Sequence, residues 1–306
     1  MHVEMKHSRA GRALPALVTN VLIWSSMPLF LKHFTHILDA WTVNGTRYTV
    51  AVLFWLPAVL WSYRTKIRGT GILRAAILPA VFHAGGQICW ALSPYYNDAS
   101  VMHFIARASF LFVMLFGFLL LAEERVLMRR PLFWIGAAGT ITGVFFMYVG
   151  GVGTGSITPV GMVLLLATAA CWALYGIMIK RCMHAYSVRM SFGVISIYTV
   201  PVLWVLMFAF GDWRQLADVG PNDWALLVFS GLGGIALCHV LLYVVIRHLG
   251  PIITDGTFQL IPFLTVLGAW LLFEERMSVM QWAGGILLVA AAYFFIMTRH
   301  EYPPPA

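Results

Sequence analysis

The chain has 306 residues, of which 60% are hydrophobic and 10% are charged, and its mean hydropathy is +0.83. Soluble globular domains carry about 25% charged residues, so this composition excludes an ordinary soluble domain and indicates an integral membrane protein. Each span needs roughly 20 residues, so ten spans leave only short turns and no room for a soluble catalytic or nucleotide-binding domain. The formal net charge of +8 must then reflect membrane topology or an acidic partner.

Ten apolar runs, cut at charged residues and at Gly/Pro clusters, predict ten transmembrane helices in an all-α integral membrane fold. The first run follows a basic segment, as a signal peptide does, but it has no clear small-residue cleavage site, so we interpret it as an uncleaved span. The runs cover residues 13–31, 41–63, 74–96, 99–122, 131–150, 158–181, 190–210, 223–246, 251–273 and 279–298.

Lys and Arg are distributed unevenly over the two sides of the membrane that these runs create. With the N-terminus in the cytoplasm, fifteen of the twenty lie in cytoplasmic segments, three lie outside, and Arg47 and Arg107 lie within spans. This positive-inside bias predicts a multi-pass protein of the bacterial inner (plasma) membrane with both termini in the cytoplasm. The basic charge therefore requires no nucleic-acid partner.

The four cysteines lie in or at the ends of apolar runs and lack paired spacing. The sequence thus supports neither a disulfide framework nor a metal site, and we interpret these residues as small packing residues. They are Cys89, Cys171, Cys182 and Cys238.

The second part of the chain repeats the first at a shift of about 150 residues. Because each unit has five helices, an odd number, the second copy enters the membrane inverted. We therefore expect two repeats, 1–150 and 151–306, in a single membrane domain. Inverted repeats are typical of secondary transporters, whose substrate site lies near the midplane between the halves. The matching pairs are Leu121–Arg125 with Leu272–Arg276, Trp24 with Trp172, Gly85–Gly86 with Gly233–Gly234, Tyr95 with Tyr243, and Trp134 with Trp282.

Two such five-helix halves, each with a helix that ends in Glu and with small-residue helices that close it, resemble the drug/metabolite transporter superfamily in its ten-helix EamA-type branch. Within that branch the stretch from Asn97, the segment from His103 to Arg107 and the Ile246–Pro251 turn are most similar to aromatic amino acid exporters of the YddG type. The resemblance implies export of aromatic and other bulky neutral amino acids. The chain has Leu111 where the second half has Pro262, so a kink of the ninth helix need not recur in the fourth.

Three formal charges lie within spans away from the helix ends, where a charge costs several kcal/mol unless it faces a cavity or a partner. Arg107, with His103 one turn earlier on the same face, offers a bidentate fork for a carboxylate. The alternative is an Arg107 paired with Asp98 or with backbone carbonyls. We interpret Arg47 as structurally paired, as the resemblance implies, and Asp255 as a capping or snorkelling residue near the inner end of its helix.

Two histidines, His83 and His239, lie on the predicted third and eighth helices away from the ends. Histidine titrates near physiological pH, so each is a candidate for proton coupling or substrate binding. The alternative is a buried imidazole that donates to a neighbouring carbonyl.

The twelve Trp, eleven Tyr and twenty-one Phe exceed what two interfacial belts require. Trp24 and Trp172 precede helix-weakening residues in the first helix of each half, where a central cavity needs walls. Aromatic walls suit a substrate with an apolar side chain through stacking and suit organic cations through cation–π attraction. The candidate substrate-binding set is completed by Trp90, Tyr175, Tyr243 and Gln259, the last as a hydrogen-bonding partner for an amino group.

The two glycine pairs, Gly85–Gly86 and Gly233–Gly234, either allow close helix packing or act with Pro262 as gating hinges. On the hinge interpretation, helices three, four, eight and nine line the cavity and pivot near these residues.

No GxxxxGK[ST] motif is present, so transport should be secondary, and the lack of GxSxG and HExxH motifs argues against an intramembrane enzyme. The leading hypothesis is a transporter that exports aromatic and other bulky neutral amino acids by alternating access. The alternative is an exporter of lipophilic organic cations, which needs an acidic residue in the cavity. The expected partners are a small-molecule substrate and membrane lipid, without a cofactor, a metal or nucleic acid. The sequence leaves the oligomeric state open, with a monomer as the simplest assembly.

Overall fold

A computed structural model describes residues 2–62, 64, 71–97, 102, 105–150, 158–273 and 278–301, with side chains from Ala13 onward except at 148, 150, 266, 268–273 and 299–301. Within these ranges the regular elements are helices. The α-helices are α1 (His2–Phe34), α2 (Ala40–Ser62), α3 (Ile72–Leu92), α5 (Ser109–Leu120), α6 (Pro131–Gly150), α7 (Pro159–Cys182), α8 (Val188–Phe210), α9 (Pro221–Gly231), α10 (Cys238–Leu249), α11 (Pro251–Phe258), α12 (Leu260–Phe273) and α13 (Val279–Glu301). Short helices are η2 (Ser93–Tyr95), η3 (Leu127–Arg129), η4 (Trp213–Ala217) and the π-helix η5 (Leu232–Leu237).

Six helical segments in the described part of the chain are long and apolar enough to cross a membrane, and two shorter helices are also apolar. Large apolar side chains on their outer surfaces are exposed, for example Val205 at 66% and Phe210 at 69%. Soluble proteins rarely expose contiguous apolar surface on this scale, so the surface fits contact with lipid tails. The long segments are Ala13–Phe34, Ile72–Tyr95, Pro159–Cys182, Val188–Phe210, Pro221–Leu249 and Val279–Thr298, and the shorter ones are Ser109–Leu120 and Pro131–Met147.

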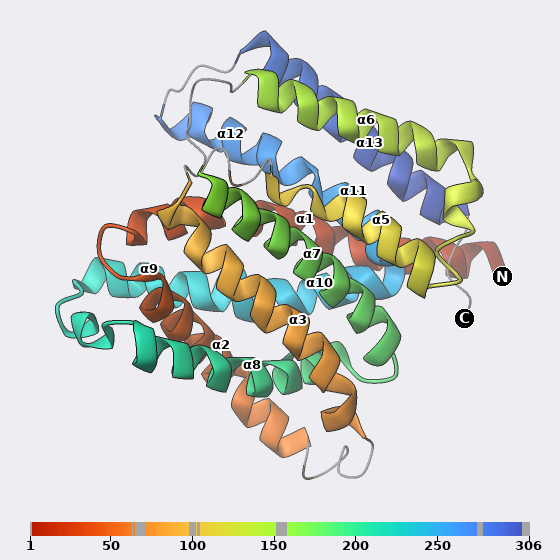
Figure 1. Ribbon diagram of the computed structural model, residues 1–306. Coiled ribbons are helices and arrows are strands. Elements are labelled where there is room, and N and C mark those ends of the chain that lie inside the picture. Colours follow the sequence, from red (N-terminus) through yellow and green to blue (C-terminus); the bar gives the residue numbers. More distant parts are fainter. Residues whose placement is uncertain are drawn as a thin grey trace.

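The helices form a bundle in which segments from the two parts of the chain alternate (Figure 1). One edge consists of α6 and α13 side by side, and α2 packs with α8 at the opposite edge. Between these edges α3 packs against α7, α1 against α10, and α5 against α7 and α11. Each of these pairs joins a helix before residue 151 to one after residue 158, so the core is built between the two parts of the chain. The start of α1 and the end of α13 lie at the same end of the bundle (Figure 1).

The fourth and ninth predicted helices are both interrupted. Only the ninth contains a proline that indicated an interruption. The prediction of one continuous helix over 99–122 was wrong within the described residues, because a turn at Arg107 and Ala108 precedes α5. There the Ala108 N–H bonds Ile105 O at 2.9 Å, in the tighter i to i−3 pattern. Gln259 separates α11 from α12 in the same way, and its N–H bonds Gly256 O at 3.4 Å.

Pro262 explains the second interruption. Proline has no N–H, so it cannot donate to the carbonyl four residues earlier, and its ring crowds that carbonyl. In this chain that carbonyl belongs to Phe258, the last residue of α11. The interruption of the fourth predicted helix occurs without a proline. Leu111 stands at the position that matches Pro262, so the sequence gave no reason to expect it.

The predicted eighth helix changes to π-helical geometry in its middle. The segment η5 contains the glycine pair Gly233–Gly234, and its neighbouring carbonyls accept side-chain donors from other helices. Trp24 Nε1 donates to Gly234 O at 2.9 Å and Trp55 Nε1 donates to Ala236 O at 3.0 Å. Asn20 Nδ2 donates to Cys238 O at 2.6 Å. Because π-turns shift the regular bonding pattern, these contacts from α1 and α2 satisfy backbone groups at the bend.

Candidate functional site

The bundle contains a cavity that is partly open to solvent, with about 950 Å³ of space between its atoms when the open part is included. Its walls come from α1, α2, α3, the turn before α5, α5 itself, α7, the η5–α10 segment, α11 and α12. The predicted third, fourth, eighth and ninth helices line the cavity as expected, and α1, α2 and α7 contribute as well. Six of the predicted substrate-binding residues line this cavity: Trp24, Trp90, Arg107, Trp172, Tyr175 and His239.

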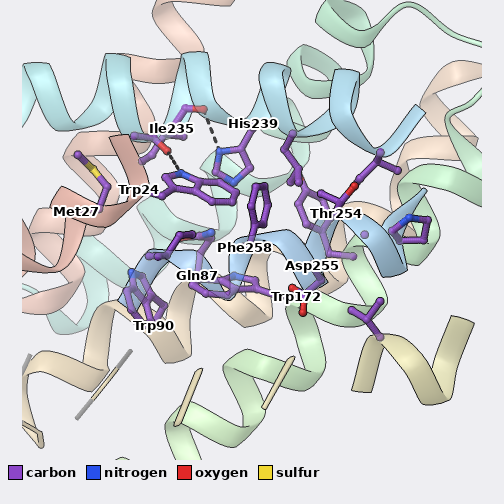
Figure 2. Close-up of a pocket in the computed structure, with 18 of the residues that line it drawn as sticks. Trp24, Met27, Gln87, Trp90, Trp172, Ile235, His239, Thr254, Asp255 and Phe258 are labelled. Atoms are coloured by element: carbon purple, nitrogen blue, oxygen red, sulfur yellow. Dashed lines mark hydrogen bonds between the residues drawn. The ribbon is translucent and has the colours of Figure 1, made fainter. Parts of the chain in front are cut away.

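Aromatic rings form two groups on the cavity wall. Trp24 packs edge to face with Phe258 at 5.2 Å between ring centroids and with His239 at 5.6 Å. Figure 2 shows these three side chains together, with the Trp24 and His239 hydrogen bonds to the η5 backbone drawn as dashed lines. Trp90 and Trp172, from α3 and α7, form the second group at 5.0 Å. Such rings bury apolar surface of a ligand and stack on flat groups.

The interruptions before α5 and after α11 bring polar groups to one part of the cavity wall. Arg107 Nη1 donates to Phe258 O at 3.0 Å, and Arg107 Nε is buried without a hydrogen-bond partner among the described residues. Gln259 Nε2 lies 3.5 Å from Arg107 O and 3.4 Å from Asp255 Oδ2. Ser109 Oγ donates to the Asp255 carboxylate, with both oxygens at 3.1 Å. Arg107 thus contacts a backbone carbonyl, which is one of the two alternatives left open above, and it also lines the cavity.

The interpretation of Asp255 as a capping or snorkelling residue was wrong. Its carboxylate bonds Ser109 and Gln259, and the residue lines the cavity. The prediction assumed that Asp255 lies near the end of a full membrane span. In the structure it lies in α11, a short helix that ends beside the cavity. The i and i+4 spacing of Asp255 and Gln259, which places both on one helix face, was the signal that could have revealed this polar face.

Arg47 has the structural partner that was expected and also lines the cavity. Its Nε donates to Ser230 Oγ at 3.0 Å, and its Nη2 lies 3.7 Å from Met27 Sδ. Met27, Gln87 and Thr254 also line the cavity and were not singled out from the sequence.

A cluster of buried polar rings lies next to the cavity. His83 Nε2 is 2.9 Å from Tyr48 Oη, its Nδ1 has no partner, and its ring centroid is 4.8 Å from that of His239. His239 Nδ1 bonds Ile235 O at 2.9 Å, as in the alternative of a histidine that donates to a carbonyl. Tyr175 Oη and Tyr243 Oη are 2.6 Å apart. The cluster joins α2, α3, α7 and α10, and two of its rings, Tyr175 and His239, form part of the cavity wall.

Three of the predicted substrate-binding residues that the structure describes are not on the cavity wall. His83 and Tyr243 belong to the buried ring cluster, and Gln259 lies behind Arg107 and Asp255. His103 lies outside the described residues, as does Asp98.

The first glycine pair lies in regular α-helix where α3 crosses α7, and a Cβ on Gly86 would be 2.7 Å from Trp172 Cδ1. The second pair lies in the π-helix, where a Cβ on Gly234 would collide with Met27 Sδ. Both pairs therefore allow a close approach between helices, and Gly234 also lines the cavity.

Comparison with known proteins identifies relatives that are transporters. An uncharacterized transporter of Methanothermobacter thermautotrophicus is 25% identical over 228 residues, which cover 73% of this chain and 62% of that protein. The chain thus spans 62% of the length of this curated relative. A solved crystal structure superimposes with a TM-score of 0.73 at 17% identity, covering 93% of this chain and 96% of that chain. At this identity the likeness shows a shared fold alone.

The family comparison covers most of the chain. The model of the EamA-like transporter family matches twice, over residues 12–149 and 159–297. The family and the curated relative are both transporters and not enzymes. The apolar helices, the lipid-facing surface and this double match lead to one assignment: the chain is a multi-pass membrane protein that belongs to the EamA-like transporter family.

Proposed function

We propose that this protein exports neutral amino acids with aromatic or other bulky side chains, as a secondary transporter of the YddG type that works by alternating access. The observation that carries the proposal is the position of Arg107. This cation lines an intramembrane cavity whose other walls include the aromatic residues Trp24, Trp90, Trp172, Tyr175 and Phe258. Arginine binds carboxylates through charge-assisted bonds in a planar fork, and every neutral amino acid has one carboxylate.

The proposed architecture has ten membrane-crossing segments in two inverted halves, 1–150 and 151–306, in the inner membrane of a bacterium with both termini in the cytoplasm. Three observations support it. The family model matches twice, the interruptions at Ala108 and Gln259 occur at positions related by the repeat, and α3 packs on α7 as α10 packs on α1. The common end at which α1 begins and α13 ends agrees with an even number of crossings (Figure 1).

In this proposal the substrate carboxylate approaches Arg107 and the side chain enters the aromatic part of the cavity. Trp24 and Phe258 form one wall, and Trp90 and Trp172 form another. The contact from Arg107 to Phe258 O orients the guanidinium. The glycine pairs and Pro262 are the proposed pivots for the exchange between inward and outward access.

Reconstitution tests the proposal directly. Purified protein in liposomes should accelerate the movement of labelled phenylalanine, tryptophan and leucine compared with protein-free liposomes, and unlabelled amino acids should compete. Parallel measurements with and without an imposed pH gradient separate proton-coupled from facilitated transport. If amino acid flux equals that of empty liposomes in every condition, the proposed substrate class is wrong.

A second candidate function is the export of lipophilic organic cations. The observation that favours it is the carboxylate of Asp255 on the cavity wall, together with tryptophans that attract cations through their ring faces. Tetraphenylphosphonium distinguishes the two functions, because a cation exporter should transport it and an amino acid exporter should not.

A further inference from the structure

Asp255 presents a carboxylate to the interior of the cavity. Three residues on one face of α11 line the cavity with it: Pro251, Thr254 and Phe258. The neighbouring residues 253, 254, 256 and 257 are buried, whereas Asp255 keeps partial exposure. Because α11 lies inside the bundle, the exposed part of this side chain faces the cavity (Figure 2).

The described residues satisfy this carboxylate only in part. Its donors are the Ser109 hydroxyl and the Gln259 amide, both of which are neutral. An ionised carboxylate has about four lone-pair sites, and Ser109 has a single hydroxyl proton to share between two oxygens. The carboxylate therefore has room for another donor, and a charged donor would form the strongest bond.

Arg107 does not supply that bond, although its charge lies close enough to interact with the carboxylate. The described side chains of Arg107 and Asp255 line the same cavity but form no ion pair with each other. Arg107 is directed to Phe258 O instead, and Gln259 lies between the two residues, 3.5 Å from Arg107 O and 3.4 Å from Asp255 Oδ2. The cavity wall thus holds Asp255 together with two cations, Arg107 and Arg47, and no described contact joins either guanidinium to its carboxylate.

We propose that Asp255 binds the α-ammonium group of the substrate while Arg107 binds its carboxylate, so that the cavity selects zwitterions over the matched amine and the matched acid. The inference rests on the proposed function, because it takes an amino acid as the substrate. It assigns the ammonium group to Asp255, whose carboxylate accepts from the Gln259 amide. The aromatic walls then hold the side chain that projects from the α-carbon.

Three probes with the same phenyl group test the inference on purified full-length protein: phenylalanine, 2-phenylethylamine and 3-phenylpropanoate. Their binding is measured by calorimetry with the wild-type protein and with Asp255→Asn, Asp255→Glu and Asp218→Asn. Asp218 is an exposed aspartate at the end of η4 and serves as the matched control. Thermal unfolding of each variant reports on folding.

The wild-type protein should bind phenylalanine about tenfold or more tightly than either singly charged probe, since each charge-assisted bond contributes at least that factor. Asp255→Asn should weaken phenylalanine and phenylethylamine binding by about tenfold or more on the same basis, and it should leave phenylpropanoate binding unchanged or stronger. Asp255→Glu should retain the order of the three probes, and Asp218→Asn should match the wild type.

Several results would overturn the inference. Equal wild-type affinities for phenylalanine and phenylpropanoate would do so without any variant, which keeps the test valid if Asp255→Asn does not fold. A folded Asp255→Asn that loses all three probes equally would assign Asp255 a structural role instead. If the wild type binds phenylethylamine but not phenylalanine, the amino acid function fails. A loss of the amine in Asp255→Asn would then still support Asp255 as the ammonium site, and retention of it would not.

Discussion

Arg107 and Phe258 lie 151 residues apart in the sequence and meet where two helices are interrupted. The Arg107 guanidinium donates to the Phe258 carbonyl at 3.0 Å, the same carbonyl that Pro262 leaves without its helical donor. In return Gln259 Nε2 lies 3.5 Å from Arg107 O. Each interruption thus supplies a side chain to the backbone of the other, which places a cation and a broken helix on the same cavity wall.

Arg107→Ala should strongly reduce amino acid transport. Loss of a charge-assisted hydrogen bond removes about 1.5–3 kcal/mol, which corresponds to roughly ten- to a hundredfold in affinity. The measurement is the concentration dependence of phenylalanine flux in liposomes, with Arg214→Ala, an exposed arginine in η4, as the control. Transport at the wild-type rate and affinity would place the carboxylate elsewhere, for example at half-helix N-termini or at hydroxyl groups of the cavity.

Trp172→Ala should change which side chains are preferred more than it changes overall transport. Trp172 packs on Trp90 and on Gly86, so its removal enlarges the aromatic part of the cavity and leaves the polar part intact. Competition of tryptophan, phenylalanine and leucine against labelled phenylalanine measures the preference. Trp213→Ala, which removes an exposed indole outside the cavity, is the control. An unchanged order of competitors would remove Trp172 from the specificity-determining wall.

Gly86→Leu and Gly234→Leu should abolish transport. A Cβ on Gly86 would come within 2.7 Å of Trp172 Cδ1, so a larger side chain forces α3 and α7 apart. If the glycines are hinges, the variants still fold and are inactive. If they serve close packing alone, thermal stability falls together with activity. Gly220→Ala is the matched control because no atom lies within 4 Å of a Cβ there, and normal flux in the leucine variants would reject the hinge.

Pro262→Ala should raise thermal stability and lower transport. The new N–H can bond the Phe258 carbonyl, and a proline inside a helix costs about 3 kcal/mol. The restored bond competes with Arg107 for that carbonyl and closes the interruption after α11. Pro201→Ala, at an exposed proline within α8, should stabilise the protein in the same way and leave transport unchanged. A Pro262→Ala protein with wild-type flux would show that transport does not need the interruption.

The proposed topology predicts that a reporter fused after Ala306 is active on the cytoplasmic side. Fifteen of the twenty Lys and Arg residues lie in segments assigned to that side, and such a bias orients membrane proteins. The same reporter inserted after Gly220, in the short segment before α9, should report the opposite side. A C-terminal reporter that is active only outside would contradict the topology.

The sequence by itself determined the membrane character and the approximate extent of the apolar helices. These features depend on composition and on run length, which the bilayer selects directly. It also located the interruption of the ninth helix to within a few residues, because the missing N–H of Pro262 acts on the local backbone whatever surrounds it. The sequence also identified mid-span aromatic residues such as Trp24, Trp90 and Trp172 as candidates for the cavity wall. Large aromatic side chains at that depth mostly pack against other helices or line a cavity.

Only the tertiary structure decided which polar residues face the cavity. The sequence placed Asp255 near a helix end. It did not show which of His83 and Asp255 faces the cavity. In the fold, α11 ends inside the bundle, so Asp255 reaches the cavity, whereas α2, α7 and α10 enclose His83 among other rings. The turn at Arg107 and the π-helix at Gly234 also have no local signal of the kind that proline provides. They persist because side chains from other helices bond the backbone at those points, and such long-range partners are set by how the helices pack.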